Sequence, residues 1–289
     1  MKLFLNKTMH IVFSILLVTT VLLTGCGGKD LTTEEILNNT KAAMEKINSY
    51  KIAYDMVLNM EIVGGEQAMK MAMDGTGTGA MDVINKKMQM ALDVDAEISG
   101  TGTSQIKMTM TMEMYMVDGW LYTKMTIPMS GVQWTKTKVE GNETSQDQLA
   151  QLLQLMKSTI QITLTGTEKV NGVDCYVLQI TPNMTELWQW MMSQQGSNLA
   201  GDIDLSQFDI SKLIKSYELK YWISKTNFNL IKAKADMSMD VDPAALGASV
   251  DDFERMTMLI DLDMIFSDYN KAVDIQLPAD AVNAKETSQ

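Results

Sequence analysis

The chain has 289 residues, and its 36 acidic residues outnumber its 24 basic ones, which gives a net charge of −12. Nucleic acids are bound through basic patches, so this balance excludes nucleic acid as a partner. His10 is the only histidine and lies in the N-terminal apolar segment. Histidine-based catalysis and histidine-ligated metal sites are therefore excluded from the rest of the chain, and we expect no enzyme, no cofactor and no metal.

Residues 1–25 are typical of a secretory signal peptide. Lys2 and Lys7 flank the start of an apolar run of 15 residues, shorter than the about 20 that a membrane-spanning helix needs. The run leads into Leu23-Thr24-Gly25-Cys26, which resembles the bacterial lipobox, where a signal peptidase cuts before a cysteine that carries lipid. We predict an extracytoplasmic domain, anchored to the cell membrane by lipidated Cys26 through a linker at 26–31. An uncleaved anchor helix is the alternative.

One helix and a long series of strands follow the linker. Thr32 and Glu35 have the spacing of a capping box, and apolar residues continue at helical spacing to about Ile47. Apolar and polar residues then alternate, which predicts antiparallel strands with one apolar and one wet face. These strands cover 52–62, 69–73, 88–98, 108–116, 231–241 and 256–266.

Glycines and asparagines mark the turns between the strands. Asp118-Gly119 and Asn171-Gly172 are typical of two-residue hairpin turns. The glycine-rich segment 75–79 would weaken a flat strand and would permit a bend or bulge in a curved sheet.

Two further helices are predicted between the strands, at 145–158 and at 183–193, from apolar residues at helical spacing. Cys175 lies in an apolar strand, and we expect it to be a small buried side chain because Cys26 is taken by lipid. The strands before and after the helices share one pattern, so we predict a single domain over 32–289.

The order of these elements resembles the LolA/LppX-like lipoproteins. The segments 117–122, 221–232 and 266–278 carry the resemblance, together with the lipobox. It implies an α+β fold, a strongly curved antiparallel β half-barrel with helices covering its concave face. It also implies a lipid carrier, since characterised members of the family hold acyl chains in that concavity. The methionine content departs from the family pattern.

Methionine is the most unusual feature of the composition, with 27 in the chain. Five fall at alternate positions in 108–116 and would form one thioether stripe on a strand. Methionine is flexible and polarizable, so such a stripe suits an adaptable apolar surface. The hypothesised cavity for a lipid or another hydrophobic ligand is lined by Met56, Met60, Met88, Met90, Met108, Met110, Met112, Met114, Met116, Leu152, Met156, Trp188 and Met191.

Three other interpretations stay open. The stripes can be ordinary core, with methionine as a compositional habit. They can bind copper(I), because thioethers are soft ligands, although the methionines extend along whole strands and no histidine assists them. Alternatively, the protein can be a scaffold or sensor that binds another envelope protein. Its anchors would then be Trp120, Trp134, Trp188, Trp190 and Trp222.

Overall fold

The computed structural model describes residues 31–64, 68–100, 103–128, 131–139, 160–182, 213–242 and 254–287. The chain divides into two compact units. Within the described ranges, the smaller unit comprises 31–46, 160–182 and 218–231, and the larger unit comprises the residues from 47 to 139, 213–217 and 232–287.

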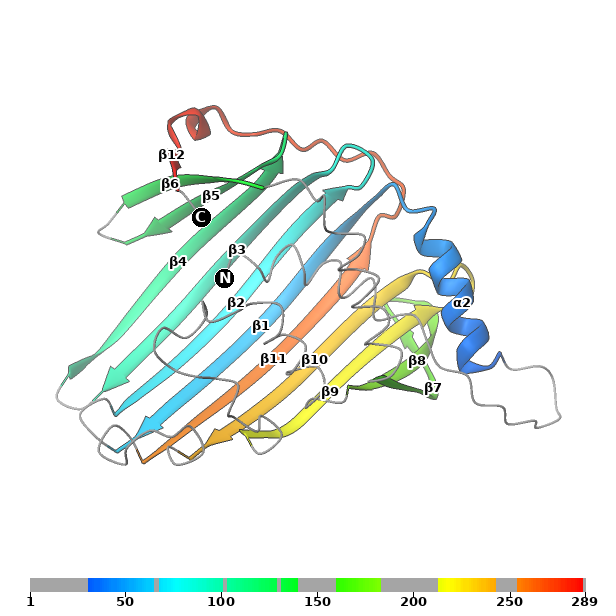
Figure 1. The fold of residues 1–289 in the computed structure, drawn as a ribbon, viewed down its shortest axis with the longest axis horizontal. Coiled ribbons are helices and arrows are strands. Elements are labelled where there is room, and N and C mark those ends of the chain that lie inside the picture. The colour runs from blue at the N-terminus through cyan, green and yellow to red at the C-terminus, as the bar shows by residue number, and fades with distance from the viewer. Residues whose placement is uncertain are drawn as a thin grey trace. The chain divides into compact units, whose positions relative to one another are not determined.

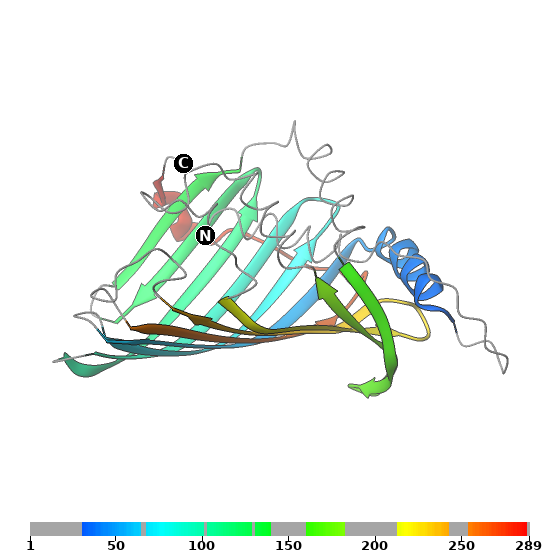
Figure 2. The same ribbon diagram turned by 60° about the horizontal axis from the view of Figure 1, so that its bottom comes forward.

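The larger unit is a sheet in the order β12-β6-β5-β4-β3-β2-β1-β11-β10. Its neighbouring strands pair in antiparallel fashion, except for the short parallel pairing of β12 with β6. Figure 1 shows its long strands side by side, and Figure 2 shows them turned by 60°. The strands are β1 (Ser49–Val63), β2 (Met69–Asp82), β3 (Lys87–Gly100), β4 (Thr103–Val117), β5 (Trp120–Ile127), β6 (Gly131–Lys138), β10 (Leu230–Val241), β11 (Arg255–Ser267) and β12 (Lys285–Glu286).

The smaller unit contains α2 (Thr33–Met44) and the strands β7 (Ile160–Val170), β8 (Val173–Pro182) and most of β9 (Ile214–Ser224). The predicted capping box is confirmed. The Thr32 hydroxyl accepts from the Glu35 backbone at 3.2 Å, and the Glu35 carboxylate accepts from the Thr32 backbone at 2.8 Å. The helix ends at Met44, three residues before the predicted end at Ile47.

The predicted hairpin turns are also confirmed. Asp118 and Gly119 have φ of 51° and 79°, and they join the paired residues Val117 and Trp120. Asn171 and Gly172 have φ of 48° and 84° between β7 and β8. Positive φ at both central residues gives the turn the twist of its flanking strands, and Asn, Asp and Gly tolerate it best.

The predicted antiparallel sheet is therefore confirmed, while the predicted fold class needs correction. The described residues are mostly β, with α2 as their one α-helix, and the pairing order of the strands does not close. The helices predicted at 145–158 and 183–193 lie outside the described residues. No described helix covers a concave face, and a cover by those two segments stays a prediction.

Candidate functional site

The strand methionines of the predicted cavity lie on one face of the larger unit. Directly paired residues of neighbouring strands share a face, so the register decides this point. One cross-strand row contains Met56, Gly75, Val94 and Met110. The next two rows along β4 contain Met112, opposite Leu92, and Met114, opposite Met90. The alternating pattern therefore forms a continuous methionine-rich face across β1, β2, β3 and β4.

Most of these methionines are neither fully buried nor fully exposed. Met88 is buried, with 3% of its surface exposed, whereas Met56, Met60 and Met90 and the whole 108–116 stripe are half-buried. A tightly packed core would bury them all. Leu152, Met156, Trp188 and Met191, the remaining residues of the predicted cavity, lie outside the described residues.

The glycines of β2 shape the same face in a way that the sequence did not reveal. The segment 75–79 would permit a bend or a bulge, and it forms no bulge, because β2 pairs with β1 and β3 without a register shift from Gly75 to Gly79. Gly77 instead makes room for Tyr54, since a Cβ there would lie 2.4 Å from Cζ of the ring. The Tyr54 ring thus crosses β2 and its hydroxyl donates to the Ala91 carbonyl at 3.1 Å. Burial raises the pKa of Tyr54 to about 12.

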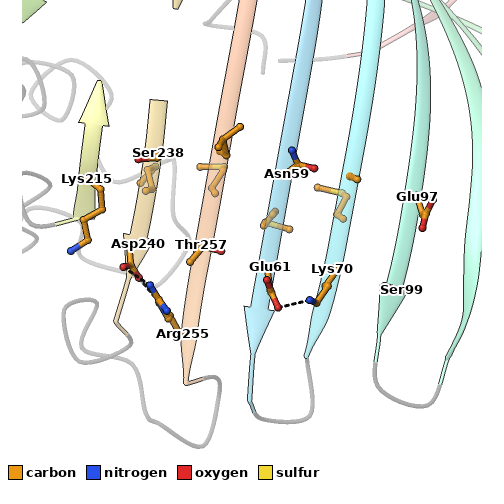
Figure 3. Close-up of a pocket in the computed structure, with 16 residues that line it drawn as sticks. Asn59, Glu61, Lys70, Glu97, Ser99, Lys215, Ser238, Asp240, Arg255 and Thr257 are labelled. Carbon is orange, nitrogen blue, oxygen red and sulfur yellow. Dashed lines mark hydrogen bonds and ion pairs between the residues drawn. The ribbon is translucent and has the colours of Figure 1, made fainter. Parts of the chain in front are cut away.

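The opposite face of the larger unit is polar and carries a cavity of about 580 Å³. Lys70 pairs with Glu61 at 2.8 Å, and the Arg255 guanidinium donates to both oxygens of Asp240 at 2.7 and 2.8 Å, as Figure 3 shows. The hydrogen bond from Arg255 holds the pKa of Asp240 below its usual value. The lining residues are Asn59, Met60, Glu61, Lys70, Met71, Ala72, Glu97, Ser99, Lys215, Ser238, Met239, Asp240, Arg255, Thr257, Met258 and Leu259.

The cavity brings together charges that neutralise each other. Glu97 pairs with Lys107 at 2.8 Å, just as Glu61 and Asp240 have their own basic partners. Its Ser and Thr side chains have no histidine beside them, since His10 is the only one in the chain. A carboxylate held in an ion pair is a weak base, so this arrangement does not assemble a nucleophile with a general base.

Two carboxylates face each other further along the polar face. Asp236 of β10 pairs directly with Asp261 of β11, and Lys234 lies 3.3 and 3.1 Å from the two. Burial and the facing carboxyl raise the pKa of Asp236. Across the described ranges, no group of three or more His, Cys, Asp or Glu side chains is placed to hold a metal ion.

A polar network fastens the C-terminal segment to β6. Trp134 Nε1 donates to Asp280 at 3.0 Å. Nearby, the Tyr115 hydroxyl donates to Glu113 at 2.7 Å, and Lys124 pairs with the other Glu113 oxygen at 2.8 Å. Lys124 lowers the pKa of Glu113, while burial and the Glu113 hydrogen bond raise that of Tyr115. The network is structural, because each group already has a partner within it.

The tryptophans proposed as partner anchors make contacts within the protein itself, wherever the structure describes them. Trp222 is buried beside Cys175 and donates to Glu168 at 2.7 Å. Lys136 lies 4.8 Å from the centre of the Trp120 ring. Trp188 and Trp190 lie outside the described residues. The expected burial of Cys175 is confirmed, since its surface is 0% exposed.

The predicted signal peptide and Cys26 also lie outside the described residues, so their lipidation stays a prediction. No helix in the part of the chain that the structure describes is long and apolar enough to span a bilayer.

Residues 32–286 match a family of unknown function, DUF6612, and the chain belongs to this family. A sequence comparison with curated proteins gives no match. In structure, the chain is similar to lipoprotein LppX of Mycobacterium tuberculosis, with 11% identity, a TM-score of 0.39, and coverage of 83% of this chain and 96% of LppX.

The chain is likewise similar to LprF of Mycobacterium bovis, with 14% identity, a TM-score of 0.35, and coverage of 84% and 95% of the two chains. Lipovitellin, in a structure described for its lipid–protein interactions, matches with 9% identity and a TM-score of 0.30, over 80% of this chain and 26% of its own.

Proposed function

We propose that this protein is a membrane-anchored extracytoplasmic lipoprotein that binds or carries a lipid or another hydrophobic ligand on its methionine-rich face, without catalysis. The observation that supports this most is the half-burial of the 108–116 methionines on one continuous face. Their thioethers can repack around acyl chains of different shape. Burial of apolar area is worth about 25 cal/mol per Å², so one acyl chain would gain several kcal/mol.

The membrane anchor in this proposal is the lipid on Cys26. Since a lipid chain contributes about 0.8 kcal/mol per buried methylene, several chains would hold the domain at the membrane. In cells, the unchanged chain should carry an acyl label and lack residues 1–25, whereas Cys26→Ala should carry no label and keep them, because the peptidase cuts before a lipidated cysteine. An unchanged chain that carries no acyl label and keeps residues 1–25 would support the uncleaved anchor helix instead.

Ligand binding is tested by extraction and by uptake. Protein purified from its native membrane should release a lipid that mass spectrometry identifies, and stripped protein should take up a fluorescent fatty acid. Purified protein that holds no lipid and takes up no fatty acid would refute the proposal.

Two neighbouring residues of β4 provide a matched pair of variants. Met112 lies on the methionine-rich face and Thr111 on the polar face, and both are half-buried. Met112→Gln keeps the length of the side chain but places an amide on the ligand face, so it should weaken fatty-acid uptake. Thr111→Gln should not. Circular dichroism checks that both variants fold, and equal uptake by both would show that the ligand does not use this face.

A further inference from the structure

Four methionines from four neighbouring strands lie in one cross-strand row of the larger unit. Met239 of β10 pairs with Met258 of β11, Met258 pairs with Met60 of β1, and Met60 pairs with Met71 of β2. All four are half-buried and lie on the methionine-rich face. They therefore combine close spacing with partial access from solvent.

The spacing allows their sulfurs to converge. Directly paired residues of antiparallel strands have Cβ atoms about 4.5–5.5 Å apart. A methionine side chain has three rotatable bonds, so thioethers on adjacent strands can turn toward one point between them. Three neighbours in the row are enough to surround a small ion.

The other methionines do not offer the same arrangement. Met56 lies on the same strand and face as Met60, but its paired neighbours are Leu262 and Gly75. A second row joins Met81, Met88 and Met116, but Met81 and Met88 are 7% and 3% exposed, which leaves an ion little access.

Thioethers are soft, uncharged ligands, and such ligands select copper(I) over hard divalent ions. We propose that the row formed by Met239, Met258, Met60 and Met71 is a site for a soft monovalent ion, copper(I), held by three or four thioether sulfurs. The site lies on the same methionine-rich face as the proposed hydrophobic-ligand site, but it depends on sulfur and not on the apolar character of that face.

The test is a competition for copper(I) under anaerobic conditions, with the full-length protein and bathocuproine disulfonate as the competing chelator. The protein should retain one copper(I). Met60→Leu and Met258→Leu should each weaken binding by at least about tenfold, since even outer-shell changes at metal sites cost roughly 10–100-fold. Met56→Leu is the matched control, because it removes a half-buried thioether from the same strand and face, and it should bind as the unchanged protein does.

Silver(I), which does not change its oxidation state, gives a second measurement on the unchanged protein. With 13C-labelled methionine methyl groups, silver(I) should shift the signals of Met60, Met71, Met239 and Met258 and leave that of Met56 in place. Because it uses the unchanged protein, this measurement does not depend on whether a variant folds. No retained copper(I), equal losses in Met60→Leu and Met56→Leu, or equal silver shifts over all methionines would each overturn the proposal.

Discussion

The clearest test of the methionine-rich face is the substitution of one glycine under it. Gly77→Ala would place a Cβ 2.4 Å from Cζ of Tyr54 and 2.5 Å from the backbone oxygen of Ala91. Real Cβ atoms do not come so close, so the Tyr54 ring must leave its position over β2. Gly75→Ala is the control on the same strand and face, because the closest atoms to its Cβ would be side-chain ends, Leu92 Cδ1 at 3.2 Å and Met56 Cε at 3.4 Å, with the backbone oxygen of Asp93 at an ordinary 3.7 Å.

The difference between the two variants can be worked out from these contacts. Overpacking of a filled site costs about 1–3 kcal/mol, and the hydrogen bond from Tyr54 to Ala91 is worth about 1 kcal/mol more. Both variants gain about 0.5–1 kcal/mol because alanine loses less backbone freedom than glycine in a strand. Gly77→Ala should therefore lower the free energy of unfolding by about 2 kcal/mol. In Gly75→Ala the close contact with Leu92 Cδ1 offsets most of the gain, so this variant should change the free energy of unfolding by less than about 0.5 kcal/mol.

Urea unfolding followed by circular dichroism measures both values, and Tyr54→Ala completes a double-mutant cycle with Gly77→Ala. The cycle should give a coupling energy of about 1 kcal/mol or more, because the clash with the ring is absent once the ring is removed. A Gly77→Ala protein as stable as Gly75→Ala, or a cycle without coupling, would show that Tyr54 does not lie over this glycine.

Three further predictions concern groups whose pKa is raised by burial. Burial raises the pKa of Tyr50 and Tyr54 from 10.0 to about 12, so the folded chain binds more protons between these values, and its melting temperature should fall as pH rises from about 10 to 12; a flat profile would contradict this. Asp236, opposite Asp261, has a pKa raised above 3.8, so Asp236→Asn should add about 0.5 kcal/mol of unfolding free energy at pH 7. That gain should vanish below pH 3.8, and an equal gain at pH 3 would show that the charge of Asp236 is not its cause. The Cys175 thiol is 0% exposed and burial raises its pKa, so in a chain without the lipidated cysteine it should resist Ellman's reagent until urea unfolds the protein; fast labelling of the folded chain would contradict this.

Local patterns in the sequence predicted the elements of the larger unit well. The period-two alternation of 108–116 placed its methionines on one face, and β4 has that arrangement. The capping box and the hairpin turns were predictable for the same reason, since each depends on residues within a few positions of one another. The role of Gly77 could not be read this way, because the glycine segment alone does not show that Tyr54 is its paired neighbour.

The sequence by itself determined which residues share a face of each strand, because side chains alternate along any extended chain. Only the tertiary structure decided which strands become neighbours and in what register. Met60 and Met258 are separated by nearly 200 positions in the chain, yet β1 and β11 pair so that the two lie side by side. No turn of fixed length links these strands, so their register follows from the packing of the whole sheet. The row of four methionines, and with it the proposed copper(I) site, exists only at that level.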